Sequence, residues 1–294
     1  MNLNSRQSRF KSTLLASLKL IRVKQWVKNT FVFAPLVFAG LFTDSKAIFD
    51  VSITFLLFCL GSSIAYIIND LFDIEKDRNH PIKSEERPLA SGELSKNQAL
   101  GLVVIFSLLL LFGGIWQHSV GVVVLLYILL NFFYSIYLKH QPIIDIFIIS
   151  IGFVMRVYAG AVAVNVPVSP WMFVTTLCLA LFLASLKRKQ ELILAGKDGR
   201  KVLQHYNVSL VDKYAQIAST GALLFYSLFV MTSRPNMVFS IPFVLYGIFR
   251  YWYLVESLKS GESPTDALLS DYQLIVTILL WAGVCMWTLF PSGA

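Results

Sequence analysis

The sequence predicts an all-α integral membrane protein, a polytopic bundle of about nine transmembrane helices. Of its 294 residues, 56% are hydrophobic and only 14% are charged, whereas a soluble domain carries roughly 25% charged residues. The charged residues are also gathered in short stretches between long apolar runs. This alternation is typical of a chain that crosses a bilayer many times.

Nine segments are long and apolar enough to cross about 30 Å of hydrocarbon, which takes roughly 20 residues of α-helix. They cover residues 26–43, 47–69, 98–117, 119–138, 142–164, 170–186, 214–232, 237–255 and 272–290. Lys28 and Pro35 interrupt the first. The fifth carries Gly152 and Gly160, and such small residues let helices pack closely. We expect one transmembrane domain over 26–294, preceded by a basic cytoplasmic segment at 1–25.

The positions of Lys and Arg predict the orientation in the membrane. With the N-terminus in the cytoplasm, 22 of the 25 Lys and Arg residues lie on the cytoplasmic side. Only Lys46 and Arg234 lie on the other side, and Arg156 lies within a span. The positive-inside rule therefore predicts a multi-pass protein of the inner (plasma) membrane, with its N-terminus inside and its C-terminus outside.

The remaining composition narrows the class of partners. The net charge of +8 is explained by membrane topology and by attraction to anionic lipids, so we expect the membrane and no nucleic acid as a partner. Three cysteines lie in apolar runs and the four histidines form no HxxxH pattern, so neither disulfides nor zinc are expected. The sequence leaves a homo-oligomer open.

An acidic motif closes the second predicted span, where residues 69–81 read NDLFDIEKDRNHP. Asn69, Asp73 and Asp77 stand four residues apart and therefore share one stripe of a helix, with Asp70 beside it. Carboxylates crowded on one face repel one another unless a cation joins them. Mg²⁺ prefers oxygen ligands and is bound by a few carboxylates together with substrate phosphates. The motif therefore predicts a magnesium and diphosphate site.

Residues 69–95 resemble the first Asp-rich motif of the UbiA superfamily of intramembrane prenyltransferases, whose members are nine-helix bundles. Three further stretches resemble segments of the decaprenyl-phosphate phosphoribosyltransferases of that superfamily. These stretches are RVKQWVKN at 22–29, YSIYLK at 134–139 followed by Pro142 and Asp145, and GFVMRVYAGA at 152–161. The resemblance covers most of residues 20–200.

One segment departs from the pattern of the aromatic prenyltransferases in this superfamily, which carry a second acidic cluster after the sixth helix. Here residues 185–191 read SLKRKQE, with three cations and one carboxylate. A lipid monophosphate needs positive donors rather than a second metal site. The resemblance and this departure together imply an enzyme that transfers phosphoribosyl from phosphoribosyl pyrophosphate to a polyprenyl phosphate, with Mg²⁺ as cofactor.

We assign candidate roles to fourteen residues on this basis. The metal and diphosphate ligands, which are also the catalytic residues, are Asn69, Asp70, Asp73 and Asp77. The substrate-binding residues are Lys24, Lys28, Arg78, Lys83, Arg87, Tyr134, Lys139, Asp145, Lys187 and Arg188. For Lys24 and Tyr134, an interfacial role that involves no substrate explains the pattern nearly as well.

Two ionisable residues lie inside the fifth predicted span. Asp145 and Arg156 fall on nearly the same side of a helix, but at roughly 16 Å along its axis they cannot pair directly. Each therefore needs a partner elsewhere or a polar cavity. We expect a polar cavity beside Asp145, whereas Arg156 fits a structural pair.

Two other functions agree with part of the sequence. A prenyltransferase that moves an isoprenoid from its diphosphate to an aromatic acceptor uses the same first motif, but the second acidic cluster is missing. A transporter would show a two-fold repeat with polar residues at mid-membrane, and this sequence instead concentrates its polar residues at the cytoplasmic rim.

Overall fold

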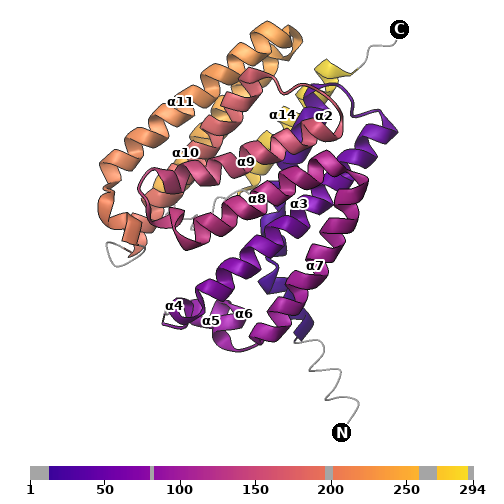
Figure 1. Ribbon diagram of the computed structural model, residues 1–294. Coiled ribbons are helices and arrows are strands. Elements are labelled where there is room, and N and C mark those ends of the chain that lie inside the picture. The colour runs from indigo at the N-terminus through magenta and orange to yellow at the C-terminus, as the bar shows by residue number, and fades with distance from the viewer. Residues whose placement is uncertain (1–12, 80–82, 196–200, 258–269, 291–294) are drawn as a thin grey trace. The chain divides into compact units, whose positions relative to one another are not determined.

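The structure, a computed structural model, describes residues 13–79, 83–195, 201–257 and 270–290 (Figure 1). The described chain contains helices and no strand. The long helices are α3 (Ser45–Phe72), α7 (Lys96–Trp116), α8 (His118–Ile136), α9 (Ile144–Ala163), α10 (Pro170–Ala195), α11 (Val208–Ser233), α12 (Ile241–Ser257) and α14 (Tyr272–Leu289). The short ones are η1 (Val23–Phe33), α2 (Ala34–Phe38), α4 (Ile74–Arg78), α5 (Lys83–Glu86), α6 (Pro88–Ser91), η2 (Leu138–His140), η4 (Lys201–His205) and η5 (Pro235–Ser240).

Eight helical segments among the described residues are long and apolar enough to cross a membrane. They coincide with the last eight of the nine predicted spans. These helices carry large exposed apolar side chains, such as Phe112 of α7, which is 78% exposed, and Trp287 of α14, which is 85% exposed. Apolar side chains exposed in this way fit contact with lipid, so the predicted all-α membrane bundle is confirmed.

The first predicted span, 26–43, is not a single α-helix. The chain runs through the 3-10 helix η1 and then the short α-helix α2, which has Pro35 in its first turn. Proline lacks the amide hydrogen that a continuing helix needs, so it favours a new start at this point. Since a 3-10 helix rises about 2.0 Å per residue and an α-helix about 1.5 Å, the two elements extend roughly 30 Å.

The chain divides into two compact units, which are described separately. Unit 1 comprises Met1–Asn29 and Ile53–Ile136, and unit 2 comprises Thr30–Ser52 and Tyr137–Ala294. In unit 1, α7 and α8 form a hairpin with a close backbone approach at Gly114 and Gly121, where a Cβ on Gly121 would lie 2.9 Å from the Gly114 Cα. That residues 26–294 form one transmembrane domain after a basic segment at 1–25 stays a prediction.

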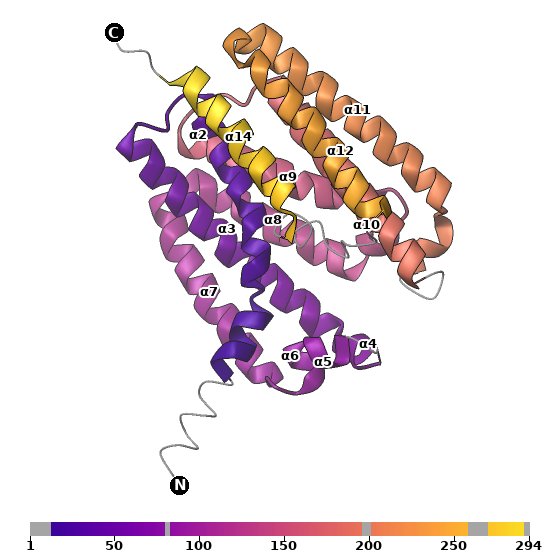
Figure 2. The same ribbon diagram turned by 180° about the vertical axis from the view of Figure 1, so that it is seen from behind.

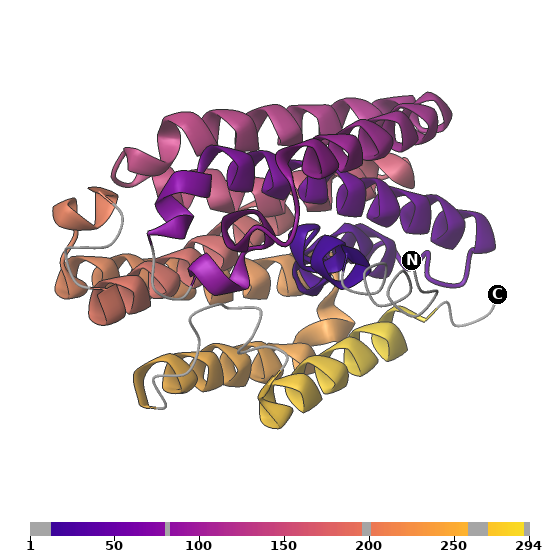
Figure 3. The ribbon, with the colours of Figure 1, turned by 90° about the horizontal axis from the view of Figure 1, so that it is seen from below.

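A buried cluster in unit 1 fixes the chain around the acidic motif. Leu20, which ends the helical residues 13–20, and the next residue, Ile21, pack with Ile67 of α3, Ile74 of α4 and Leu89 of α6. The short helices α4 and α6 therefore lie beside this N-terminal helix, which is drawn in indigo in Figure 3. Burial of each such aliphatic side chain contributes roughly 1.5–3 kcal/mol, so this cluster holds the segment that follows α3.

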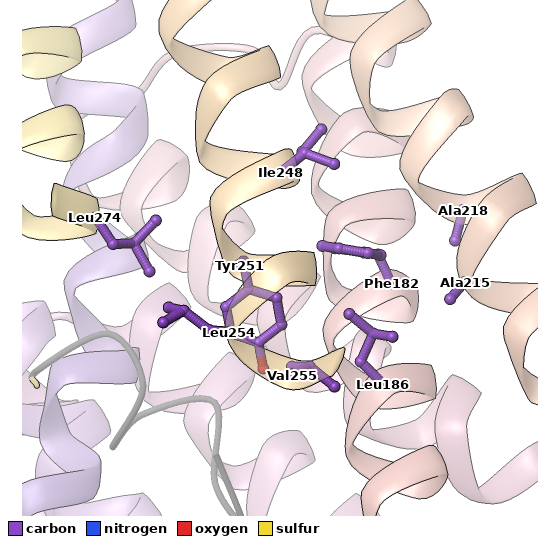
Figure 4. Close-up of a cluster of buried hydrophobic side chains, with 9 residues drawn as sticks. All are labelled: Phe182, Leu186, Ala215, Ala218, Ile248, Tyr251, Leu254, Val255 and Leu274. Atoms are coloured by element: carbon purple, nitrogen blue, oxygen red, sulfur yellow. The ribbon is translucent and has the colours of Figure 1, made fainter. Parts of the chain in front are cut away.

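Unit 2 is built on α9, α10, α11 and α12, and the last three run side by side in Figure 2. Phe182 and Leu186 of α10 lie between Ala215 and Ala218 of α11 on one side and Tyr251 of α12 on the other (Figure 4). The rings of Phe182 and Tyr251 meet edge to face with their centroids 5.8 Å apart. This cluster fixes the part of α10 that leads into the predicted basic segment.

The close packing predicted for the glycines of the fifth span is found at Gly160 of α9. A Cβ at this position would lie 1.9 Å from the backbone oxygen of Val32. No side chain fits there, so the glycine lets the segment before α2 lie directly on α9.

Candidate functional site

The acidic motif follows a bent helix rather than one straight helix. α3 ends at Phe72, and Asp73 precedes α4 with φ −96° and ψ 6°. Helical hydrogen bonds nevertheless continue through the bend, because the Asp73 N–H donates to the Asn69 oxygen at 3.0 Å and the Asp77 N–H to the Asp73 oxygen at 2.8 Å. The predicted stripe on a single helix was therefore wrong in detail, although the four-residue hydrogen-bonding pattern persists.

Asp70 is buried and paired with two arginines of unit 1. Its Oδ1 accepts a hydrogen bond from Arg87 at 2.7 Å and a second, shorter one from Arg22. The Asp70 side chain is 2% exposed, whereas those of Arg22 and Arg87 are 22% and 26% exposed. Two cations thus converge on one carboxylate, and both remain within reach of solvent.

Arg22 is a residue that the sequence analysis left out of the site. It lies at φ 54°, and its guanidinium stands 4.6 Å from the centre of the Tyr66 ring. A positive φ is uncommon for a residue other than glycine, and here it places the side chain on Asp70. The signal in the sequence was the start of the RVKQWVKN stretch at Arg22, but the 48 residues between the two partners hid the contact.

The rest of that stretch has a structural explanation within unit 1. The Asn29 amide donates to Ser62 Oγ of α3 at 3.2 Å, and Trp26 Nε1 donates to Ser63 Oγ at 3.1 Å. Ser63 Oγ in turn donates to the Ile21 oxygen at 3.0 Å. These polar contacts attach η1 to α3, while the predicted ligands Lys24 and Lys28 are exposed and half-buried, respectively.

The cations that follow the motif lie in different surroundings. Lys83 Nζ is 3.7 Å from Asp77 Oδ1, so this lysine joins the acidic residues. Arg78 pairs with the exposed Glu75 at 3.3 Å. Arg78 also lines a cavity of about 360 Å³ together with Lys96. Neither Arg87 nor any of the predicted metal ligands lines this cavity.

The donors of the motif suit magnesium in kind. Among the residues that the structure describes, no three His, Cys, Asp or Glu side chains form a metal-binding group. Mg²⁺, however, is often held by one or two carboxylates together with substrate phosphates and water. Asp73 and Asp77 supply such oxygens, while Asp70 is engaged by its two arginines.

A second ionic cluster lies in unit 2 and is deeply buried. Arg188 Nε donates to Asp145 Oδ2 at 2.6 Å, and the Tyr206 hydroxyl donates to Asp145 Oδ1 at 2.7 Å. The side chains of Arg188 and Asp145 are 1% and 0% exposed. Arg188 also pairs with Glu191. The expected polar cavity beside Asp145 was therefore wrong, because side chains satisfy this carboxylate.

Residues 185–191 are not a cationic surface in the folded chain. Lys189 is buried and donates to Asp212 at 2.8 Å and, over a shorter distance, to Glu256. Together with Arg188, two cations meet four carboxylates, those of Asp145, Glu191, Asp212 and Glu256. Three of these partners come from distant segments, so the basic character of the linear sequence does not survive folding.

The other predicted residues are distributed between the two units. Tyr134 is half-buried near the end of α8 in unit 1. In unit 2, Lys139 is buried in η2 and Lys187 is half-buried on α10. Arg156 donates to the Gly152 oxygen at 2.6 Å and stands 5.5 Å from the Phe153 ring centre, both within α9, and its structural pairing stays a prediction.

The fold and the acidic motif together define an integral membrane protein with its ionic residues concentrated near helix ends. Residues 32–270 match the UbiA prenyltransferase family, and the chain belongs to this family. It is 34% identical over 280 residues to the decaprenyl-phosphate phosphoribosyltransferase of Corynebacterium glutamicum, covering 90% of this chain and 83% of that protein. It is 33% identical to the enzyme of the same name from Mycolicibacterium smegmatis, covering 93% of this chain and 92% of that one.

A solved structure has the same fold. A UbiA homologue from Archaeoglobus fulgidus, bound to DMAPP and Mg²⁺, superposes with a TM-score of 0.69 over 93% of this chain and 98% of the homologue. The two sequences are only 18% identical, so this likeness supports the fold alone.

Proposed function

We propose that this transferase moves the 5-phosphoribosyl group of phosphoribosyl pyrophosphate to a polyprenyl phosphate and releases pyrophosphate. The observation that carries the proposal is the similarity to decaprenyl-phosphate phosphoribosyltransferases over about nine-tenths of the chain. The acidic motif at residues 69–77, which the sequence predicts to bind magnesium and diphosphate, supports the same proposal.

The chemistry needs little acid–base assistance. An oxygen of the lipid phosphate forms a bond to the anomeric carbon of the ribose, and the bond from that carbon to pyrophosphate breaks. The attacking oxygen is already anionic, so no proton has to be removed from it. The protein therefore has to align the two substrates and neutralise the charge that develops on the leaving group.

Unit 1 supplies the groups for the diphosphate. When bound, Mg²⁺ would neutralise diphosphate charge. Asp73 and Asp77 are the carboxylates best placed to hold it, with Asn69 as a further oxygen donor. Arg22, Arg87 and Lys83 already surround the acidic residues. We infer that these cations contact the phosphates directly, and that Asp70 orients the two arginines rather than binding the metal.

Unit 2 supplies the groups for the lipid phosphate. Lys139 and Lys187 are the predicted cations that we infer contact this phosphate, because Arg188 is buried against Asp145 and also paired with Glu191. Arg188 and Asp145 then act as a support for the surrounding backbone. The proposed role of Arg188 thereby changes from binding the lipid phosphate, as the sequence predicts, to supporting the fold.

The aromatic prenyltransferase alternative is supported by the family itself and by the carboxylates that gather near α10. In a metal-dependent site these carboxylates would face a cation supplied with the substrate. Here Arg188 and Lys189 neutralise them from within the chain. Because these two side chains already neutralise the carboxylates, a second site for metal and diphosphate is not favoured here, and the phosphoribosyl reaction is favoured over prenyl transfer.

Labelled phosphoribosyl pyrophosphate and defined polyprenyl phosphates, incubated with the purified protein, test this function. We expect a labelled lipid and free pyrophosphate, with both lost on adding EDTA. Transfer of a prenyl group from its diphosphate to 4-hydroxybenzoate, without the phosphoribosyl reaction, would establish the alternative.

We also propose that the protein lies in the inner membrane with its N-terminus in the cytoplasm, as 22 of its 25 Lys and Arg residues favour. A reporter fused after Ala294 should then be active only outside the cytoplasm. Activity inside would indicate that residues 23–38 do not cross the membrane.

A further inference from the structure

An unusual turn precedes α9 in unit 2. Ile143 has φ 68° and ψ −48°, and the Ile144 N–H donates to the Pro142 oxygen at 2.8 Å. This is a γ-turn of the rare strained form. A positive φ is a true outlier for a β-branched residue, and such a conformation costs on the order of 1–3 kcal/mol and persists only where its surroundings enforce it.

The hydroxyl of Tyr206 is the group that holds this turn. It accepts the hydrogen bond of the Ile143 N–H and donates its own hydrogen to Asp145 Oδ1 at 2.7 Å. One hydroxyl thus satisfies an orphan amide at the start of α9 and a carboxylate in its first turn. Burial and the bond to Asp145 raise the pKa of the Tyr206 phenol above its usual range, so it remains a donor at working pH.

The ring and the carboxylate are themselves fixed. Tyr206 is 5% exposed and packs with Val202 and Val211, which anchor it beside η4 and α11. Asp145 is held on its other oxygen by Arg188 of α10. Arg188 and Tyr206, which lie 43 and 61 residues from Asp145 in the sequence, therefore converge on the start of α9.

That connection carries a predicted substrate ligand. Lys139 lies in η2, four residues before the strained turn, and η2 contacts η4. The Lys139 side chain is only 9% exposed. The direction of a lysine in so confined a place depends in part on the backbone that carries it, and that backbone leads directly into the turn at Ile143, which Tyr206 holds.

We propose that Tyr206 is a positioning residue that fixes residues 138–145 so that Lys139 meets the phosphate of the lipid substrate. Tyr206 itself touches no substrate. The inference rests on the proposed function for the identity of that phosphate, and on the hydrogen bonds of Tyr206 for the positioning.

The test compares Tyr206→Phe with Tyr226→Phe. Tyr226 is a matched control because it is also buried in unit 2 and its hydroxyl bonds with Ser240 at 2.6 Å and Trp281 at 2.9 Å, within a different cluster. Each variant keeps its ring and loses one hydroxyl. Amide hydrogen exchange over residues 138–145 reports the turn, and steady-state kinetics with each substrate in turn report positioning.

In Tyr206→Phe we expect exchange in 138–145 to accelerate about tenfold, as for loss of one hydrogen bond. The KM for polyprenyl phosphate should rise about tenfold, with kcat and the KM for phosphoribosyl pyrophosphate within about twofold of wild type. Tyr226→Phe should lower the melting temperature about as much as Tyr206→Phe does, but should change neither the exchange in 138–145 nor the KM for polyprenyl phosphate.

Two results would overturn the inference: unchanged exchange in 138–145, or kinetic effects that match those of Tyr226→Phe. A wild-type protein that does not turn over these substrates would overturn the proposed function instead. The exchange data would still decide in that case whether Tyr206 holds the turn.

Discussion

The two ionic clusters of the molecule differ in burial. Around the buried Asp70 in unit 1, the arginine side chains are 22% and 26% exposed, so their outward N–H groups remain within reach of a substrate phosphate while Asp70 holds them. Around Asp145 in unit 2, Arg188 is 1% exposed. Separating charges there leaves an uncompensated buried ion. The same residue types thus form a partly exposed cluster in one unit, where we propose that the diphosphate binds, and a buried one in the other.

The largest effect is expected from the carboxylates of unit 1. Asp73→Asn or Asp77→Asn removes a ligand charge but keeps the side-chain shape, and loss of a metal ligand costs several kcal/mol of transition-state stabilisation. Turnover should therefore be abolished while the protein remains folded in the membrane. Glu75→Gln, on the exposed side of α4, is the control and should keep its activity. Near-normal turnover of Asp77→Asn at saturating Mg²⁺ would remove the motif from the site.

The difference in burial between the two clusters predicts a difference in the unfolding free energy that each contributes. Arg188→Met leaves Asp145 buried without its main cation and should cost about 3–5 kcal/mol of unfolding free energy. Arg22→Met leaves Asp70 paired with Arg87 and should cost less, about 1.5–3 kcal/mol for one hydrogen bond to a charged group. Thermal unfolding in detergent measures both.

A double variant sharpens this result. Asp145→Leu combined with Arg188→Met removes both buried charges and should recover much of the stability lost in the single variant, since an apolar pair can replace a buried ion pair. Equal losses for Arg188→Met and Arg22→Met would mean that the two clusters do not differ as their burial indicates.

A kinetic prediction follows for the partly exposed arginines beside Asp70. Arg87→Ala should raise the KM for phosphoribosyl pyrophosphate by roughly ten- to a hundredfold, because a charge-assisted hydrogen bond contributes about 1.5–3 kcal/mol. The KM for polyprenyl phosphate should change little. Arg78→Ala is the control, since Arg78 lines a separate cavity. An equal effect of both variants would place Arg78 in the diphosphate site as well.

Much of the fold could be predicted from sequence, because each membrane span is a local property of about 20 residues. Eight of the nine predicted spans are found as long helices. The first failed as a single helix because Pro35 and the polar contacts of Asn29 favour a different local structure. The acidic motif was also visible, since its residues lie close together in the chain.

The ionic partners could not be predicted, because they are separated widely in sequence. Arg188 looked like part of a basic patch, yet its partner Asp145 lies 43 residues away, and the Glu256 partner of Lys189 lies 67 residues away. Tyr206 gave no signal at all, since its role depends on the backbone of Ile143. A count of charges in a segment therefore describes topology better than it describes a binding site.

The smallest effect is expected at Lys187, which tests whether Arg188 of the buried cluster has a structural role rather than a binding role. Lys187 is half-buried beside the buried Arg188, so it is the cation of this segment best able to reach a lipid phosphate. Lys187→Ala should raise the KM for polyprenyl phosphate by roughly fivefold, corresponding to about 1 kcal/mol for one hydrogen bond, with unfolding unchanged. Arg188→Ala should instead lower stability first and affect both substrates alike. Titrating each substrate at saturating concentrations of the other distinguishes the two. If Arg188→Ala impaired only the lipid substrate and left unfolding unchanged, Arg188 would be a ligand after all, and the buried cluster would be a binding site like that of unit 1.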